Sequence, residues 1–283
     1  MDRDFTVKEI QELEFEILKY LKEVCEKNNL RYYLAYGTLI GAVRHKDIIP
    51  WDDDIDVMLP REDYKKLVQI LTENPHPYYK IISVDTNSKF QVPLPKLVDT
   101  RTILIQDYDI VETVPLGLYV DLFLIDGGGD NFEESLLHYN EAFNLYKKWK
   151  KSRLKLFPTG FSKVHGFLRW VKNIYFKVRG SCHYMKMLEE HNSKYSFYHS
   201  KYVATLETGT SDANKCIWKY EDFGEGVLLE LRGEVFNVPN NYAKILESEY
   251  GNYMELPPEE KRQSHHSYHL KWNEHFAYSG EIE

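Results

Sequence analysis

The sequence lacks the features of a secreted, disulfide-bonded or membrane-spanning protein. No stretch approaches the roughly 18 consecutive apolar residues that a spanning helix needs, and the start Met-Asp-Arg-Asp-Phe does not have the basic and then apolar order of a secretion signal. The three cysteines are odd in number, far apart and without metal-ligand spacing, which indicates reduced structural thiols. We therefore expect a cytoplasmic protein that does not use a catalytic cysteine.

Acidic residues are missing from one segment of a chain that is otherwise acidic. Residues 142–188 contain twelve Lys or Arg and no Asp or Glu, although the whole chain has 36 basic and 44 acidic residues. This asymmetry argues against a general nucleic-acid binder and for one localised basic surface. The apolar stripe over 164–178 is most often that of a core-facing helix, whereas the aromatic residues mixed among the cations suit contact with an anionic bilayer or a polyanionic glycan.

Apolar residues make up 43% of the 283-residue chain, which is ample for one large domain or two smaller ones. Periodicity predicts helices over 7–28, 61–71, 133–156, 163–179 and 242–250, with Thr6 as the first cap, and a brief helix that ends at 43. Strands are expected over 31–36, 55–59, 79–84, 90–98, 102–105 and 117–126, and a hairpin over 227–239 that turns at Arg232 and Gly233. The glycine run 127–129 predicts a hinge, and with it a boundary between residues 1–126 and 127–283.

The most unusual stretch is 36–56, whose last five residues include four aspartates. Carboxylates held so close together repel one another, so a fold that keeps them there favours a bound cation. In the strand expected from Ile55, successive side chains point to opposite faces. Asp54 and Asp56 therefore share one face, while Ile55 enters the core.

A second apolar strand, over 117–126, carries Asp121 as its one charged residue before the strand's last position. Burying a lone carboxylate in such a strand is costly unless positive charge meets it. Asp121 is therefore the natural third carboxylate for the site of Asp54 and Asp56.

Three rival interpretations apply to these clusters. A solvated acidic loop is the commoner explanation for grouped charge. The aspartate spacing also matches a calcium loop, but Val57 stands where that loop's sharp turn needs glycine. Near the other end of the chain, His265, His266 and His269 are close enough to suggest zinc, although no cysteine lies near them to complete a thiolate site.

Three segments carry a resemblance to a known family. They read Tyr36-Gly-Thr-Leu-Ile-Gly-Ala-Val-Arg-His-Lys, Ile49-Pro-Trp-Asp-Asp-Asp-Ile-Asp-Val and Gly117-Leu-Tyr-Val-Asp-Leu-Phe. Together they resemble the LicD family, the bacterial phosphorylcholine transferases related to fukutin-type ribitol-phosphate transferases and similar to the nucleotidyltransferase superfamily. Tyr250-Gly-Asn-Tyr-Met-Glu-Leu-Pro-Pro and a following histidine also resemble the C-terminal signature of this family.

The resemblance implies an α+β fold, in which a nucleotidyltransferase-like mixed sheet with helices is followed by a mostly helical C-terminal region containing a β-hairpin. It implies that Asp54 and Asp56 hold one or two magnesium ions, with manganese as an alternative, and that Asp121 completes the site. Gly37 and Thr38 would approach the nucleotide phosphates. Metal chemistry agrees, because hard divalent cations take carboxylate oxygens and can clamp the oxygens of a displacement at phosphorus.

Several further residues are candidates for substrate binding. Arg44 and Lys96 could neutralise phosphate charge, with a surface salt bridge as an equal alternative for each. Trp51 could stack on a base or on choline, or simply pack against its neighbours. A substrate contact from His265 or His266 follows from the family resemblance alone. Asp121 is also the candidate base for the acceptor hydroxyl.

The sequence thus predicts metal-dependent transfer of a phospho-alcohol, with phosphocholine from CDP-choline preferred over a related CDP-alcohol. The acceptor would be a sugar hydroxyl of a lipid-linked cell-surface glycan precursor of the teichoic acid or lipopolysaccharide type. Residues 142–188 would contact the inner face of the membrane peripherally, and no nucleic acid would be bound. Two alternatives stay open: an Asp-x-Asp glycosyltransferase that uses a nucleotide sugar, and a non-catalytic membrane or glycan adaptor.

Overall fold

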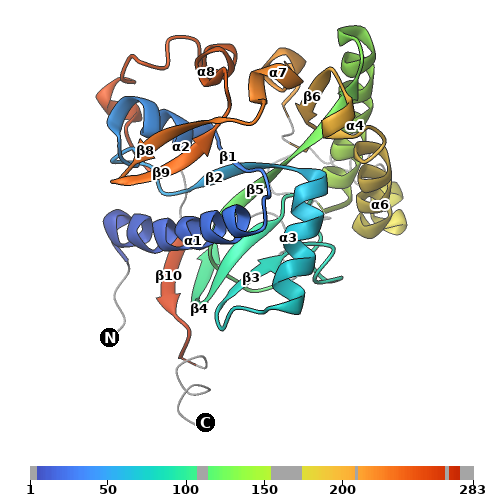
Figure 1. Cartoon of the computed structure of the whole chain (residues 1–283). Helices are drawn as coiled ribbons and strands as arrows, with labels where there is room; N and C mark the ends of the chain where they lie inside the picture. The colour runs from blue at the N-terminus through green and yellow to red at the C-terminus, as the bar shows by residue number, and fades with distance from the viewer. Residues whose placement is uncertain (1–4, 107–113, 154–173, 208–209, 265–267, 275–283) are drawn as a thin grey trace.

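The computed structural model describes residues 5–106, 114–153, 174–207, 210–264 and 268–274. One curled, mixed sheet forms the centre, and helices lie on both of its sides (Figure 1). Its main strand order is β1-β2-β5-β4-β10; β3 pairs with β4, and β6 joins β5 to β7. Helices and a mixed sheet in one chain confirm the α+β class.

The helices are α1 (Val7–Lys27), α2 (Tyr36–Ile40), α3 (Arg61–Glu73), α4 (Phe132–Arg153), α6 (Ser181–Asn192), α7 (Tyr220–Phe223) and α8 (Tyr242–Tyr250). Short helical turns are the π-helical η1 (Gly41–His45) and the 3₁₀ turns η2 (Phe197–His199), η3 (Ala213–Lys215) and η4 (Glu259–Lys261). The strands of the large sheet are β1 (Tyr33–Leu34), β2 (Asp56–Pro60), β3 (Tyr79–Ile82), β4 (Lys96–Gln106), β5 (Leu116–Gly129), β6 (Tyr202–Thr205), β7 (Ile217–Lys219) and β10 (Tyr268–Trp272). A separate hairpin consists of β8 (Val227–Leu231) and β9 (Glu234–Val238).

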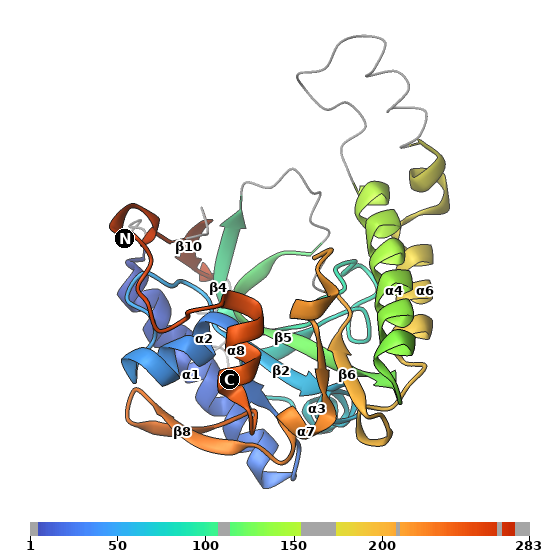
Figure 2. The ribbon, with the colours of Figure 1, turned by 90° about the horizontal axis from the view of Figure 1, so that it is seen from above.

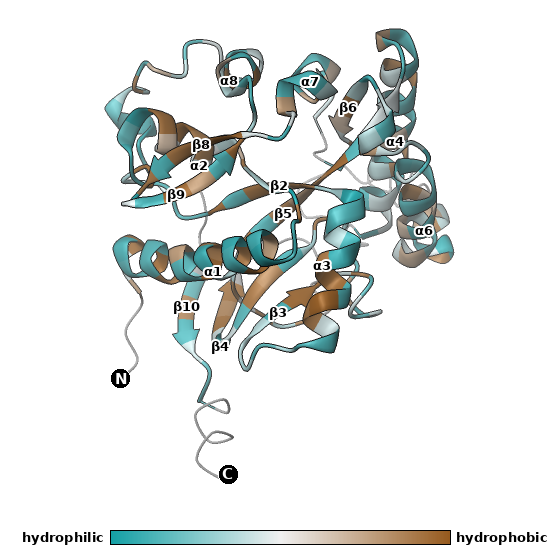
Figure 3. Ribbon diagram, viewed as in Figure 1, coloured by the Kyte–Doolittle hydropathy of each residue, from teal (hydrophilic) through white to brown (hydrophobic). Residues whose placement is uncertain are grey.

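Strand β2 lies at the centre of the sheet and is buried on both faces. Val57 and Leu59 belong to one apolar cluster together with residues of α1, whereas Met58 belongs to a second cluster on the other face. Figure 3 shows the same layering, with apolar colour along the central strands and polar colour on the outer sides of the helices. The predicted alternation of side chains along this strand is confirmed.

Helix α1 begins where the sequence predicts. Thr6 accepts a hydrogen bond from the backbone N–H of Glu9 at 3.3 Å, and the Glu9 carboxylate accepts one from the Thr6 backbone N–H at 2.9 Å, which makes a capping box. Apolar residues such as Ile17 and Leu21 are fully buried against the sheet. Two polar residues of α1, Gln11 and Glu14, are also buried, and they face the acidic stretch.

The strands expected over 90–98 and 102–105 are one strand, β4, which starts only at Lys96. Prolines 93 and 95 have no N–H to donate to a ladder, so pairing cannot begin before them. The register of β4 against β5 shifts between Asp99 and Leu104. A Cβ at Gly117 would lie 2.0 Å from the Asp99 carbonyl oxygen, so glycine is required at this irregularity.

The hinge predicted at the glycine run is wrong. Strand β5 continues through Gly127 to Gly129 and pairs there with β6. A Cβ at Gly127 would lie 2.4 Å from the Ser196 carbonyl oxygen, so close backbone approach, rather than flexibility, explains this glycine. Strands from both sides of residue 126 share the large sheet. The division into domains 1–126 and 127–283 stays a prediction.

The late hairpin is confirmed. Strands β8 and β9 are antiparallel and joined by Arg232 and Gly233, which have positive φ values of 52° and 79°. Two consecutive left-handed residues are what a tight hairpin turn requires. After residue 126, α4 and α8 match two of the predicted helices, but the region also contributes β6, β7 and β10 to the sheet.

Helices α4 and α6 pack side by side at one edge of the molecule (Figure 2). The helix predicted over 163–179 lies mostly outside the described residues. At its end Tyr175 and Val178 are 55% and 81% exposed, so these two positions of the predicted stripe do not face a core. Within the described ranges, every helix is too short or too polar to cross a membrane.

Candidate active site

Two aspartates from parallel strands lie side by side at the centre of the sheet. Strands β2 and β5 pair in parallel with Asp56 opposite Asp121, and the Asp121 N–H donates to the Ile55 carbonyl oxygen at 3.0 Å. Residues opposite each other in neighbouring strands present their side chains on the same face of a sheet. The fold therefore brings together two of the three carboxylates that the sequence predicts, and Asp54 lies two residues before the start of β2.

Negative charge accumulates at this point. Burial raises the pKa of Asp56 well above its ordinary value, and the neighbouring charges of Asp54, Asp121 and Asp52 raise the pKa further, while Lys96 opposes them. A buried carboxylate among like charges is unfavourable unless positive charge compensates. The charge distribution thus favours a bound cation at Asp54 and Asp56.

Glu14 is a member of this cluster that the sequence analysis missed. It is 2% exposed on α1, and burial followed by the charges of Asp54 and Asp53 raises its pKa well above the usual range. Its Oε2 atom has no hydrogen-bond partner among the described residues. The only signal in the sequence is a glutamate three residues before Ile17 on the apolar stripe of the helix.

Lys96 supplies positive charge from the neighbouring strand. It is opposite Asp121 in the β4–β5 register, and its Nζ forms an ion pair with the Asp121 carboxylate. The same Nζ lies 3.5 Å from the ring centroid of Tyr119. Although burial opposes the charge, Asp121 raises the pKa of Lys96, so the ammonium stays charged. Lys96 therefore forms a salt bridge, as the alternative for this residue has it, but in a part-buried position; its phosphate role stays a prediction.

The glycine turn packs directly against the acidic stretch. The Thr38 hydroxyl accepts the backbone N–H of Asp56 at 2.9 Å. A Cβ at Gly37 would lie 2.5 Å from the Asp52 Oδ2 atom, so only glycine allows this approach. Tyr36, just before it, has a positive φ of 46°, a strained value for a residue of this size. Gly37 and Thr38 therefore lie at the site, while their contact with phosphates stays a prediction.

The acidic loop, which carries Asp52, Asp53 and Asp54 between η1 and β2, is held in place by residues near both ends of the chain. The Gln11 side chain donates to the carbonyl oxygens of Ile49 at 3.0 Å and of Asp52 at 2.7 Å. The Ser264 hydroxyl donates to the Asp53 carboxylate. Asp52 and Asp53 are both buried, so they support the loop, and the solvated acidic loop is wrong.

Arg44 and Trp51 lie on the side of this loop that faces the C-terminal segment. The Arg44 guanidinium donates to the carbonyl oxygens of Tyr253 at 2.6 Å and of Glu255 at 3.2 Å. The Arg262 guanidinium lies 5.6 Å from the ring centroid of Trp51. These contacts show that both residues pack against the C-terminal segment; their roles with phosphate or base stay predictions.

Some candidate ligands cannot be placed or do not fit. His265 and His266 lie outside the described residues, and His269 is in β10. Val57 is inside β2, where a strand replaces the turn of a calcium loop, so the calcium interpretation is wrong.

The carboxylates near Asp56 meet the needs of a divalent cation in chemistry but not in arrangement. Over the described ranges, no three His, Cys, Asp or Glu side chains are already arranged around a single point where a metal could bind. Asp121 is engaged by Lys96. Even so, Asp54 and Asp56 offer the hard oxygen ligands that magnesium prefers, and they belong to a cluster in which negative charges outnumber positive ones. Their chemistry therefore fits magnesium.

A cavity of about 360 Å³ opens beside Asp56. Its lining comes from β2, β5, α2, α8 and the region of η3, and consists of Tyr36, Asp56, Phe123, Thr210, Lys215, Cys216, Glu249 and Tyr250. The cavity therefore extends from the acidic centre, formed by Asp54, Asp56 and Asp121, to a wall of aromatic side chains.

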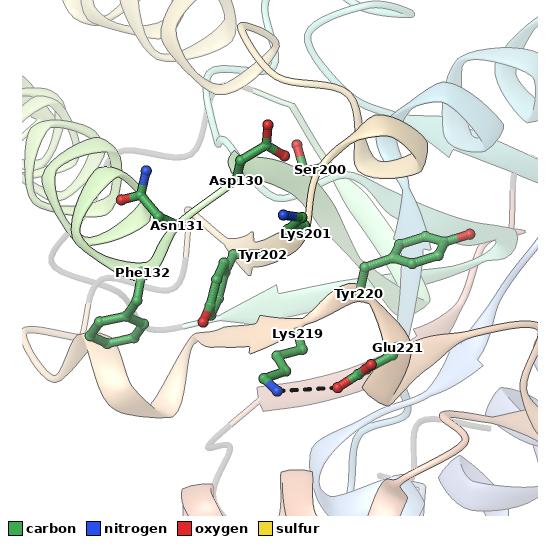
Figure 4. Close-up of a pocket in the computed structure, with 9 residues that line it drawn as sticks. All are labelled: Asp130, Asn131, Phe132, Ser200, Lys201, Tyr202, Lys219, Tyr220 and Glu221. Atoms are coloured by element: carbon green, nitrogen blue, oxygen red, sulfur yellow. Dashed lines mark hydrogen bonds and ion pairs between the residues drawn. The ribbon is translucent and has the colours of Figure 1, made fainter.

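A second cavity, of about 490 Å³, lies at the far end of β5 (Figure 4). Polar side chains and three aromatic rings line it: Asp130, Asn131, Phe132, Ser200, Lys201, Tyr202, Lys219, Tyr220 and Glu221. The ion pair between Lys219 and Glu221, with a separation of 3.2 Å, lies on its wall. It shares no lining residue with the cavity beside Asp56.

Comparison with known proteins gives a consistent result. A family model described as the nucleotidyltransferase domain of LicD, FKTN and FKRP matches residues 29–167. The lipopolysaccharide cholinephosphotransferase LicD of Haemophilus influenzae is 30% identical over 273 residues, which cover 93% of this chain and 97% of that protein. The human ribitol 5-phosphate transferase FKRP is 44% identical over 55 residues, 19% of this chain and 11% of that protein. An uncharacterised protein of Rickettsia prowazekii is 46% identical over 59 residues, 21% of this chain and 22% of its own length.

Proposed function

Because the chain belongs to the LicD family, we propose that it transfers phosphocholine from CDP-choline to a sugar hydroxyl of a glycan precursor. The observation that carries the proposal is the match along almost the whole chain to a lipopolysaccharide cholinephosphotransferase. Similarity to a ribitol 5-phosphate transferase supports the broader class, in which a phospho-alcohol is moved to a glycan. The acceptor would be a lipid-linked precursor of the lipopolysaccharide or teichoic acid type.

The core would be a nucleotidyltransferase-like domain, as the description of the matching family model supports. In it, Asp54 and Asp56 would hold one or two magnesium ions, or manganese, and Asp121 would complete the site. A bound divalent cation would neutralise charge on the transferred phosphoryl group and lower the pKa of the acceptor hydroxyl.

The remaining roles belong to side chains beside the aspartates. Thr38 fixes the start of β2 through its hydrogen bond to Asp56. Lys96 would neutralise phosphate charge at the position where it now pairs with Asp121. The Asp121 carboxylate would accept the proton of the attacking hydroxyl. Together these residues would orient the donor and remove the proton that the reaction releases.

Asn substitution of the strand aspartates tests the proposal. Asp54→Asn and Asp56→Asn should each reduce CMP release from CDP-choline by at least about a hundredfold, because each removes a carboxylate that would hold the cation at the reacting phosphorus. Glu133→Gln, an exposed carboxylate change in the first turn of α4, is the matched control and should keep full activity. Undiminished CMP release by Asp56→Asn would contradict the mechanism.

The same assay separates the alternatives. A glycosyltransferase would release UDP from a UDP-sugar and no CMP from CDP-choline. The proximity of the glycine turn and of Asp121 to Asp56 favours the phosphotransferase, because an Asp-x-Asp glycosyltransferase needs neither. An adaptor would keep its binding function in both aspartate variants.

A further inference from the structure

The cavity beside Asp56 has an aromatic corner. The rings of Tyr36 and Phe123 meet edge to face, with centroids 4.7 Å apart and an angle of 67° between the planes. Phe123 lies two residues after Asp121 on β5, so alternation places both side chains on the same face. Tyr250, at the end of α8, adds a third ring to the lining. Tyr36, whose φ of 46° is positive, and Asp56 belong to the same lining.

The same cavity contains a carboxylate without a hydrogen-bond partner among the described residues. Both carboxylate oxygens of Glu249 are shielded from solvent, and neither has a hydrogen-bond partner among the described residues. Burial raises the pKa of Glu249 to about 8, against the influence of Lys215. A shielded carboxylate without a partner is costly, and such a group in a cavity indicates a missing cationic ligand.

The chemistry of the lining selects among cations. An ammonium ion with N–H groups would need several hydrogen-bond acceptors, and a polyol would need both donors and acceptors. A quaternary ammonium has no N–H to donate, so aromatic faces and one nearby carboxylate satisfy it. The volume of about 360 Å³ is within the ~300–1,000 Å³ range of small-molecule sites.

We propose that this cavity binds the trimethylammonium group of the transferred phosphocholine, with Tyr36, Phe123 and Tyr250 as its walls and Glu249 as the counter-ion. The proposal rests on the proposed function, which it makes specific for choline. Asp56 belongs to the same lining, so a headgroup bound here keeps its phosphate beside the acidic centre. Lys215 is the other charged residue of the lining and suits the phosphate end of the zwitterion.

A pair of donors isolates the contribution of the positive charge. CDP-choline is compared with the CDP ester of 3,3-dimethylbutanol, which has the same shape but a neutral carbon in place of nitrogen. The unaltered protein should prefer CDP-choline in kcat/KM by about tenfold or more, as expected for a desolvated cation beside aromatic rings and a carboxylate.

Three variants then locate the source of that preference. Glu249→Gln should reduce the ratio of kcat/KM for CDP-choline to kcat/KM for the neutral donor to near unity, while the neutral donor reacts as before. Phe123→Leu should weaken it by raising the KM for CDP-choline. Glu247→Gln, an exposed change on the same helix, is the control and should behave like the unaltered protein. Melting temperatures of all variants identify any that fail to fold.

Tetramethylammonium chloride provides a second readout that does not require turnover of the choline donor. It should inhibit the reaction of the neutral donor in the unaltered protein and much less in Glu249→Gln, with sodium chloride as the control salt. This result separates loss of cation binding from a general loss of activity.

The outcomes separate this inference from the proposed function. If the protein uses CDP-choline but Glu249→Gln keeps the preference, or loses both donors equally, the headgroup site is overturned and the transferase stands. If the unaltered protein releases no CMP from CDP-choline but does so from CDP-ribitol or CDP-glycerol, the choline function and the headgroup site both fall.

Discussion

At the scale of single residues, the site combines carboxylates that the fold has buried at a cost. Asp56, Glu14 and Glu249 all have raised pKa values, with burial as the largest cause. For Asp56 the second cause is repulsion from neighbouring aspartates, whereas Glu249 lacks an acidic neighbour that contributes. Buried, unfavourable charge is common at functional sites because a ligand or ion relieves it. The two groups therefore call for different ligands: a metal ion at Asp56 and an organic cation at Glu249.

The raised pKa of Glu249 leads to a prediction about pH. Below about 8 the empty site holds a protonated, neutral carboxyl, and above about 8 it holds an anion that attracts a cation. Preference for CDP-choline over its neutral isostere should therefore increase between pH 7 and pH 9. Burial also raises the pKa values of Tyr36 and Tyr250 on the same lining well above this range, so neither competes. The measurement is the ratio of kcat/KM values for the two donors against pH.

Glu249→Gln serves as the control for this pH dependence. In this variant the ratio of kcat/KM values for the two donors should stay constant from pH 7 to pH 9, because the group that titrates has been removed. Lys215 and Asp56, the other charged groups of the lining, remain in both proteins. An equal increase in the variant would show that another group titrates.

At the scale of elements, α1 is the platform on which the acidic loop rests. Its amphipathic pattern predicts a helix with one buried face, yet that face includes Gln11 and Glu14. Gln11 contributes two hydrogen bonds to loop carbonyl groups, and so fixes the backbone from which Asp54 and Asp56 project. The helix thus positions the site without supplying a residue that the sequence marks as functional.

Removing this support should loosen the metal site. Gln11→Leu deletes two hydrogen bonds to the loop backbone, each worth about 1 kcal/mol, although the Ile49 carbonyl oxygen keeps its bond from the Asp52 N–H at 2.9 Å. We expect a several-fold increase in the magnesium concentration needed for half-maximal CMP release, with a smaller change in kcat at saturating magnesium. Gln69→Leu, on the exposed side of α3, is the control. An unchanged magnesium requirement would remove Gln11 from the positioning of the loop.

At the scale of the whole molecule, one buried arginine joins elements that are far apart in the sequence. Arg61, on α3, donates to both carboxylate oxygens of Asp126 on β5, at 2.5 and 2.8 Å. It also bonds Glu189 of α6 at 2.5 Å and Glu207 at 3.2 Å. Asp126 and Arg61 are buried, so this network connects the sheet core to the region beyond residue 126 through charges that need one another.

Arg61→Met should be strongly destabilising. It leaves Asp126 and Glu207 buried without their cation, a change that typically costs about 3–5 kcal/mol. Lys65→Met, on the same helix and paired with Glu189 at 3.2 Å, loses only an exposed ion pair and should cost less than about 1 kcal/mol. Urea denaturation of both variants measures the difference. Similar losses in the two would contradict a special role for the buried network.

The basic segment, residues 142–188, supports a prediction for the molecule as a whole. Lys147, Lys148 and Lys150 are exposed on α4, and Tyr175 and Val178 of the same basic segment are exposed as well. We expect the protein to sediment with vesicles that contain anionic lipid, and a Lys147→Glu, Lys148→Glu, Lys150→Glu variant to bind them much more weakly, since each cation near such a surface contributes about 1 kcal/mol.

Vesicles of neutral lipid are the control for this experiment, and the CMP-release activity of the triple variant on a soluble acceptor should be unchanged. Equal binding to neutral and anionic vesicles would show that the segment does not act through its charge. Binding to a polyanionic glycan instead would favour the other role that its composition allows.

The sequence by itself determined the features that depend on local chemistry. The capping box at Thr6, the alternation of side chains along β2 from Asp56 onward, and the turn at Arg232 and Gly233 all follow from neighbouring residues. For this reason the acidic stretch could be recognised as a candidate site from the sequence alone.

Only the tertiary structure decided what surrounds that stretch. The pairing of Lys96 with Asp121 depends on the register of two strands, and the burial of Glu14 and Glu249 depends on which helices pack over the sheet. Gly127 was predicted to belong to a hinge because glycine runs are often flexible. Its position is instead fixed by close packing against the backbone of Ser196, which is far away in the sequence. Register and close packing join residues far apart in the chain, so local pattern carries no signal for them. The acidic stretch was readable in the sequence, but the cavity beside it was assembled by the fold.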